Sequence, residues 1–79
     1  MPRYYFDLVF DGQKPSQDEA GIVLRDIEAA QAEAARSLCH FSAKIINGKK
    51  HAHCLAIHVR DDNGEVLSAL LNFEIKRPS

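Results

Sequence analysis

The sequence predicts an α+β fold in which a four-stranded antiparallel sheet (strand, strand, helix, strand, strand along the chain) has one helix packed on one face. Three patterns carry this prediction: apolar and polar residues alternate at the start of the chain, alanines and larger apolar residues recur at helical spacing in the middle, and two alternating segments flank a turn near the end. Each strand has one apolar face, as in an antiparallel sheet that is covered on one side only.

The first strand is expected over residues 3–10. Its core face carries only apolar side chains: Tyr4, Phe6, Leu8 and Phe10. Its other face carries Arg3, Tyr5, Asp7 and Val9. Asp11-Gly12 begins a turn, and the polar segment 13–20 contains Pro15, so we expect a surface loop there before a short second strand at 21–24.

A helix is expected to begin after Asp26, a good N-cap acceptor, with Glu28 in the first turn, where the helix dipole favours an acid. The core stripe has spacings of three or four: Ile27, Ala30, Ala34, Leu38, Phe41 and Ile45. The solvent face is expected to carry Glu33, Arg36, Ser37, His40 and Lys44. Asn47-Gly48 predicts the end of the helix.

The last two strands form a hairpin whose register follows from the side-chain pattern. If Asn63-Gly64 alone formed the turn, Val59 would face Ser68 and core residues would oppose solvent residues along the ladder. A loop of Asp62, Asn63 and Gly64 removes this conflict and gives Gly64 the left-handed position that a type I turn with a bulge requires. The resulting apolar pairs are Val59 with Leu67, Ile57 with Ala69, and Leu55 with Leu71.

Length and composition predict one domain over residues 1–79, which buries about 60 to 65% of the surface of the unfolded chain. No apolar run approaches the ~20 residues that span a bilayer, and the N-terminus lacks the pattern of a secretory signal. We therefore expect a cytoplasmic protein with Cys39 and Cys54 as reduced thiols. The net charge of −1 lacks the electrostatic footprint of a nonspecific nucleic-acid binder.

The sheet face opposite the helix is expected to stay open. It would display Arg3, Tyr5, Asp7, Val9, Cys54, Ala56, His58, Arg60, Val66, Ser68, Leu70, Asn72 and Glu74. Several of these are too apolar for a purely solvated surface, which favours a dimer interface or a binding face. The residues expected to carry the contact are Arg3, Tyr5, Asp7, His58, Arg60 and Leu70. The predicted function is a non-enzymatic, self-associating interaction or regulatory module, a homodimer or a complex with another protein, without a cofactor.

Several short runs carry a family resemblance: Met1-Pro2-Arg3-Tyr4-Tyr5-Phe6-Asp7, Asp11-Gly12, Asp18-Glu19-Ala20-Gly21, Leu24-Arg25-Asp26, and Val59-Arg60-Asp61 through Gly64. They resemble a group of small uncharacterised proteins of rhizobia and related proteobacteria. The resemblance spans nearly the whole chain and implies no activity, because the group has none assigned; segment 49–54 departs from its pattern. A looser similarity to HicB-like antitoxins, which pair a hairpin with an alanine-rich helix, makes an antitoxin-type regulator one alternative.

A metal site is the first chemical alternative, because His51, His53 and Cys54, with Cys39 and His40, are ligand types that suit a transition metal. Their spacing is poor, since alternation puts the two strand histidines on one face and Cys54 on the other. Ordinary surface histidines and buried thiols explain these residues better, and no metal is expected.

Nucleic-acid binding is the main alternative function. Arg3, Tyr5, His58 and Arg60 combine basic and stacking groups of the kind that bind single-stranded RNA, although acidic residues interrupt the face. A less favoured alternative is a tautomerase-like enzyme, in which Pro2, freed by removal of Met1, would act as a general base. A proline at the edge of a strand is the ordinary explanation of Pro2.

Overall fold

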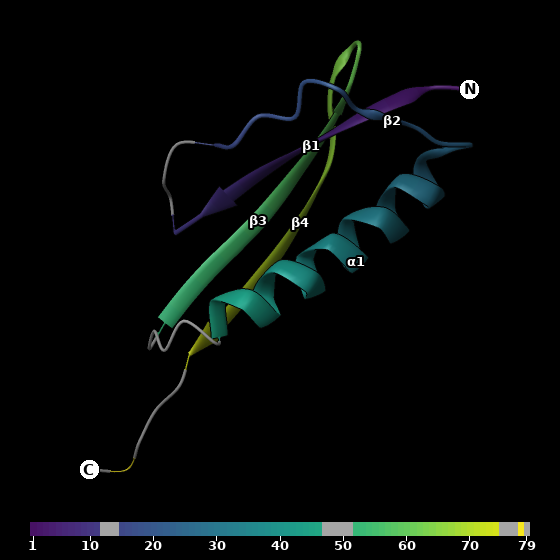
Figure 1. Ribbon diagram of the computed structural model, residues 1–79. Coiled ribbons are helices and arrows are strands. Elements are labelled where there is room, and N and C mark those ends of the chain that lie inside the picture. Colours follow the sequence, from purple (N-terminus) through teal and green to yellow (C-terminus); the bar gives the residue numbers. More distant parts are fainter. Residues whose placement is uncertain (12–14, 47–51, 75–77, 79) are drawn as a thin grey trace.

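The computed structural model describes residues 1–11, 15–46, 52–74 and 78, with the side chains at positions 45, 46, 52, 53 and 74 outside the description. In this part of the chain, four antiparallel strands form a sheet and one helix lies on one of its faces (Figure 1). The elements are β1 (Arg3–Phe10), β2 (Ile22–Val23), α1 (Ile27–Ile46), β3 (Ala52–Asp61) and β4 (Gly64–Glu74). The predicted α+β architecture is confirmed.

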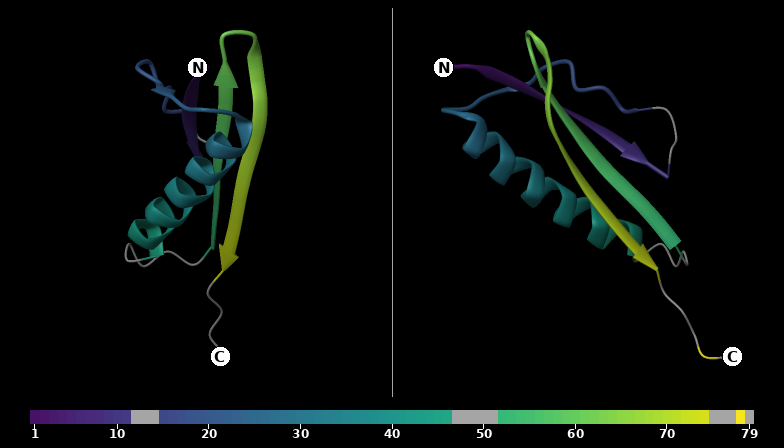
Figure 2. Two further views of the ribbon diagram at one scale, coloured as in Figure 1. Left: turned by 90° about the vertical axis from the view of Figure 1, so that its right-hand side faces the viewer. Right: turned by 180° about the vertical axis from the view of Figure 1, so that it is seen from behind.

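The strand order in the sheet is β2-β1-β3-β4. Because β1 pairs antiparallel with both β2 and β3, those two strands run parallel to each other on either side of it. Parallel strands need a crossover connection, and α1 provides it. Figure 2 shows α1 running obliquely over the sheet, and its contacts fall mainly on β3 and β4.

The loop that follows β1 turns back and lies along its outer edge. The backbones of Leu8 and Ser16 exchange two hydrogen bonds, with N to O distances of 3.1 and 2.8 Å. The predicted turn begins at Asp11, whose φ is 50°, and its partner Gly12 lies outside the described residues. The loop that follows β1 therefore covers much of the outer edge of this strand.

Strand β2 is shorter than the predicted 21–24. Gly21, with a φ of 71°, and Leu24 both lie outside it. Leu24 still joins the N-terminal segment, because its backbone N donates to the carbonyl of Pro2 at 3.0 Å. The positive φ of Gly21 redirects the chain into the short strand and limits its length.

Helix α1 begins as predicted, because Asp26 Oδ1 accepts a hydrogen bond from the backbone N of Ala29 at 2.9 Å. The buried positions recur every four residues: Ala30, Ala34, Leu38 and Ser42. A row of i, i+4 positions is inclined by about 26° to the helix axis, which suits a helix that crosses the sheet obliquely. The predicted end at Asn47-Gly48 lies outside the described residues.

The predicted stripe was therefore wrong in part. Ile27 is 42% exposed and Phe41 is half-buried, whereas Ser42 is buried and its Oγ donates to the carbonyl of Cys39 at 2.8 Å. Phe41 still packs against the core, as predicted, and Ser42 joins the buried positions because the row is inclined. The predicted solvent face carries three exposed residues, Arg36, His40 and Lys44. It also carries two half-buried residues, Glu33 and Ser37. The side chain of Ile45 lies outside the description.

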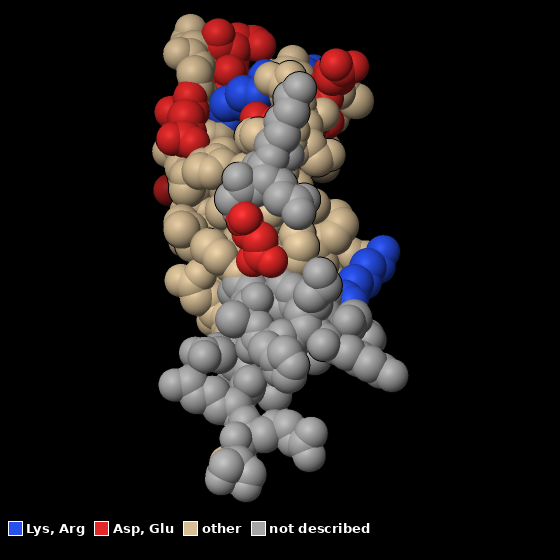
Figure 3. All heavy atoms as spheres, turned by 90° about the vertical axis from the view of Figure 1, so that its left-hand side faces the viewer, with Lys and Arg blue, Asp and Glu red and all other residues tan. Residues whose placement is uncertain are grey.

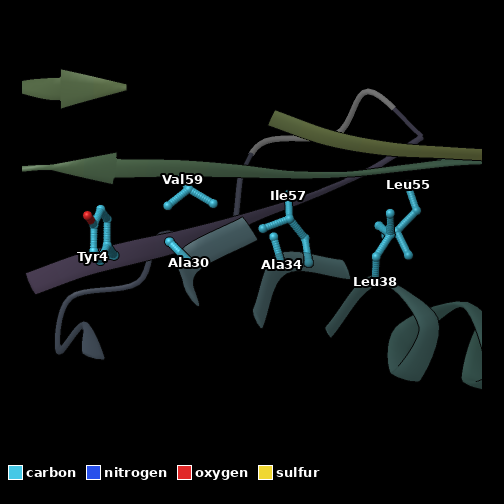
Figure 4. Packing of buried hydrophobic residues seen from close by; sticks show 7 residues of the cluster. All are labelled: Tyr4, Ala30, Ala34, Leu38, Leu55, Ile57 and Val59. Atoms are coloured by element: carbon cyan, nitrogen blue, oxygen red, sulfur yellow. The ribbon is translucent and has the colours of Figure 1, made fainter. Parts of the chain in front are cut away.

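The core lies between α1 and the helix-facing side of the sheet. Figure 4 shows each buried helix residue near a branched strand residue: Ala30 near Val59, Ala34 near Ile57, and Leu38 near Leu55. Tyr4 closes one end of this cluster. Because alanine has only a methyl group, the helix axis can approach the sheet closely at Ala30 and Ala34, which have no exposed surface.

The hairpin has the predicted register across its apolar pairs: Val59 with Leu67, Ile57 with Ala69, and Leu55 with Leu71. The predicted three-residue loop is wrong, because Asp61 pairs with Gly64 and leaves a turn of two residues. Between the pairs Val59–Leu67 and Arg60–Glu65, β4 has one residue more than β3. This residue, Val66, forms a bulge and packs partly against the core instead of on the open face. Gly64 keeps a positive φ, at 127°.

Candidate functional site

The face of the sheet opposite α1, here the open face, collects five of the six predicted binding residues in cross-strand rows. These rows are Tyr5 with Arg60 and Glu65, Asp7 with His58 and Ser68, and Val9 with Ala56 and Leu70. The first two rows are polar and the third is apolar. The sixth residue, Arg3, is exposed at the start of β1. Seen from the left of Figure 1, several acidic and basic side chains lie close together near the top of the view (Figure 3).

Arg60 is the centre of the polar end. Its Nε donates to Asp7 Oδ2 at 2.8 Å, and its Nη2 donates to the carbonyl of Asp18 at 2.7 Å. The guanidinium carbon lies 4.5 Å from the centroid of the Tyr5 ring, in the geometry of a cation–π contact. The hydrogen bond to Asp7 is the main cause that raises the pKa of the Arg60 guanidinium above its ordinary value. Arg60 is therefore held in one place by three groups of its own chain.

Asp18 anchors the loop to the sheet. Its carboxylate accepts hydrogen bonds from the backbone N of Phe6, Ala20 and Gly21, at 3.1, 3.2 and 3.1 Å. Its own backbone N donates to Asp7 Oδ1 at 2.8 Å. Burial raises the pKa of the Asp18 carboxyl, but the three N–H donors and the charge of Arg60 outweigh burial, so the pKa lies below its ordinary value.

Arg3 completes this loop clamp, which consists of Arg3, Asp7, Asp18 and Arg60. One terminal nitrogen of Arg3 donates to the carbonyl of Ala20 at 2.8 Å. Both arginines that were predicted to bind a ligand thus hold the segment between β1 and β2. Asp18 was not among the predicted site residues. The signal for it was the run Asp18-Glu19-Ala20-Gly21, in which an aspartate followed by glycine favours a side-chain-capped turn.

His58 lies beside a carboxylate and a hydroxyl. Its Nδ1 is 2.8 Å from Glu65 Oε1 and 2.9 Å from Ser68 Oγ. A serine–histidine–acid relay requires the two partners on opposite ring nitrogens, so that a proton can pass through the ring. Here both partners share Nδ1, and the group is a surface hydrogen-bond cluster without that relay geometry.

The apolar row ends at the free edge of the sheet. Ala56, which was predicted to be displayed on the open face, is only 7% exposed, because Val9 and Leu70 flank it on the neighbouring strands. Leu70 is 63% exposed, although it is a large apolar side chain in the middle of a strand. This end of the row is a candidate contact surface.

The predicted ligand types do not meet within the described part of the chain, where no group of three or more His, Cys, Asp or Glu residues could hold a metal ion. Cys39 and Cys54 are free and exposed, so their expectation as buried thiols was wrong. Strand alternation puts Cys54 on the open face, and Cys39 lies outside the buried row of α1. His51 and the side chain of His53 lie outside the described residues.

Comparison with known proteins finds a family whose function is unknown. In the described residues, no helix has the length and apolar character needed to cross a bilayer. No curated protein and no solved structure matches the chain. A family described as Domain of unknown function (DUF6894) matches residues 3–73. Because this match runs from the first residue of β1 almost to the end of β4, the chain belongs to the DUF6894 family.

Proposed function

We propose that this protein is a non-enzymatic interaction module that self-associates through the outer edge of β4 and the exposed side chain of Leu70. The observation that carries the proposal is the contrast between the two edges of the sheet. At the β1 side, β2 and the loop cover the edge, and the loop clamp holds that loop in place. At the other side, β4 is 11 residues long and no described strand lies beyond it.

An uncovered edge strand presents unpaired backbone N–H and C=O groups that another strand can bind. Proteins that stay monomeric usually protect such an edge with charged residues, proline or a very short strand. Segment 66–73 of β4 contains neither a charged residue nor a proline. The bulge at Val66 affects only the beginning of the strand. The rest of β4 is therefore suited to pair with a strand from outside the chain.

The side chains of β4 support the same conclusion from both faces of the sheet. On the helix side, Leu67, Ala69 and Leu71 are only partly buried against the core. On the open face, Leu70 is mostly exposed. Covering these apolar groups would stabilise an assembly by about 25 cal/mol for each Å² removed from water.

A second copy of the chain is the partner that we favour. A standard interface buries about 800 Å² on each partner. The isolated chain exposes 5650 Å², so such an interface would take about one seventh of the surface. A domain of this length buries a smaller share of its surface by folding than a larger domain does, and association adds to that share.

Sedimentation velocity over a concentration series tests the proposal with three proteins. We expect the wild type to have more than the monomer mass in the micromolar range and Leu70→Lys to be monomeric, because a lysine in an apolar contact loses its hydration without gaining a partner. Val23→Lys is the matched control. It puts the same charge at an exposed apolar position of β2, at the opposite edge, and should keep the wild-type mass.

Circular dichroism of the same samples shows whether each variant is folded. A wild type that is monomeric at high micromolar concentration would contradict self-association. If Val23→Lys dissociated the assembly and Leu70→Lys did not, the contact would lie at the β2 edge and the proposed surface would be wrong.

A further inference from the structure

We infer that two copies pair edge to edge through antiparallel β4 strands, in the register that puts Leu70 opposite Leu70 of the partner subunit. This inference rests on the proposed self-association and specifies its geometry. It makes one continuous sheet from the two four-stranded sheets, with both helices on the same face, because the two-fold axis stands perpendicular to the sheet.

The direction of the backbone groups supports this register. The carbonyl of Cys54 accepts a hydrogen bond from the backbone N of Asp11, and the N of Cys54 donates to Asp11 Oδ1, so both polar groups of Cys54 point toward the β1 side. In an antiparallel strand this direction alternates with each residue. The backbone N–H and C=O of Ala56 therefore also point toward β1, and those of Leu55 and Ile57 point toward β4.

The same alternation continues into β4. Since Leu55 and Ile57 exchange backbone hydrogen bonds with their partners Leu71 and Ala69, the residue between them, Leu70, directs its N–H and C=O away from β3. Ser68 and Asn72 lie two residues to either side of Leu70, so their N–H and C=O groups also point away from β3. The backbone groups that are free to bind a further strand thus belong to the residues of the open face.

The side chains select one register among those that keep each face of the sheet continuous. With Leu70 at the two-fold axis, the helix-side pairs are apolar, Ala69 facing Leu71 of the partner subunit, and the flanking open-face pair is polar, Ser68 facing Asn72 of the partner subunit. A shift of two residues in pairing would put Leu70 opposite Ser68 or Asn72 of the partner subunit. Only the register centred on Leu70 matches every one of these positions by polarity.

Disulfide trapping tests the register directly. The background carries Cys39→Ser and Cys54→Ser, which remove both natural thiols at exposed positions. In the inferred dimer the Cα atoms of the paired residues at position 70 are about 5.5 Å apart, within the range of a disulfide. With oxidised glutathione as the oxidant, most Leu70→Cys chains should form a covalent dimer on a non-reducing gel.

Two single variants are the matched controls. Ser68→Cys and Asn72→Cys each put their thiol about four residues, roughly 13 Å, from its own copy across the two-fold axis, which is too far for a disulfide. Each should therefore stay monomeric on the gel when oxidised alone. An equal mixture of the two should form mixed dimers, because these positions face each other in the inferred register. This mixture also keeps Leu70 intact.

The outcomes separate the register from self-association. A wild type that sediments as a monomer overturns both. A wild type that self-associates, together with no disulfide in Leu70→Cys and none in the mixture, overturns the edge register and leaves only self-association standing. That result points to an interface other than the outer edge of β4, such as stacking of two open faces. Disulfides in Ser68→Cys or Asn72→Cys alone show a different register and also overturn the inference.

Discussion

Arg60 of β3 and Asp7 of β1 are 53 positions apart in the sequence, and Arg60 Nε donates a 2.8 Å hydrogen bond to Asp7 Oδ2. The side chain of Asp7 is only 13% exposed, so solvent screens this ion pair less than an ordinary surface pair. The same two residues hold Asp18, through its carbonyl and its backbone N. The pair therefore fixes the covering loop to the sheet as well as β1 to β3.

The first prediction concerns acid. The folded-state pKa of Asp18 is lowered, so the carboxylate stabilises the fold fully above the unfolded-state pKa of about 3.9. This stability is lost as the pH falls through the lowered folded value, where protonation removes the charge that the N–H donors and Arg60 favour. Thermal melts from pH 7 down to pH 2 should show the loss.

Asp18→Asn should reduce the slope of melting temperature against pH in that acid range. At neutral pH it should cost about 0.5 to 2 kcal/mol, because an amide offers one acceptor oxygen where the carboxylate offers two. Asp62→Asn makes the same chemical change at the exposed tip of the hairpin and is the control. An unchanged acid slope in Asp18→Asn would show that Asp18 is not the group responsible.

The second prediction concerns Gly21. A Cβ at this position would lie 2.9 Å from Arg3 Cγ, 2.9 Å from Tyr5 Cε2 and 3.0 Å from the carbonyl oxygen of Tyr4, at a φ of +71°. Gly21→Ala should destabilise the fold by about 1 to 3 kcal/mol, because both the backbone conformation and the close approach disfavour a side chain. Urea denaturation measures the change.

Limited proteolysis gives an independent reading of the same variant. If the glycine is needed for the close approach of the loop, cleavage within 15–20 should be faster in Gly21→Ala than in wild type. Equal stability and equal cleavage would mean that Arg3 and Tyr5 move aside at no cost.

The apolar register of the hairpin was predictable because alternation permits only one pairing that puts core against core. The position of the additional residue was not. A two-residue turn with a bulge at Val66, and a three-residue loop with its bulge at Gly64, give the same pairing from Val59 onward. The sequence pattern determines how many residues lie between Val59 and Leu67. Backbone geometry decides whether the unpaired residue among them lies in the turn or in a bulge.

The candidate site was predictable as a face but not as a set of partners. Alternation correctly put Tyr5, Asp7 and Arg60 on the same side of the sheet. Whether charged residues there bind a ligand or one another depends on the loop, and Asp18 reaches Phe6 and Arg60 across 12 and 42 positions. No local pattern contains contacts of that range. Leu70 needed only the alternation, and its exposure agrees with the prediction.

The third prediction separates backbone strain from crowding at Gly64. Its φ is +127°, and nothing lies within 4 Å of the position where a Cβ would be. Gly64→Ala and Gly64→Val should therefore both destabilise the hairpin, by about 1 to 3 kcal/mol, through the backbone conformation alone.

Chemical synthesis of the chain with D-alanine at position 64 provides the control. A D-residue favours positive φ, so this protein should melt near or above the wild-type temperature. If L-alanine were tolerated as well as D-alanine, the positive φ at Gly64 would not be required for the turn.

The last prediction concerns the distance between α1 and the sheet. Ala34 has no exposed surface and lies opposite Ile57 in the core (Figure 4). Ala34→Leu adds three carbon atoms where the helix and strand are in contact, and overpacking of this kind typically costs about 1 to 3 kcal/mol. Ala32→Leu adds the same atoms at an exposed position of the same helix and should change stability by less than about 0.5 kcal/mol. Urea denaturation of both variants checks the order, and a larger loss in Ala32→Leu would mean that the i, i+4 row of α1 does not face the sheet.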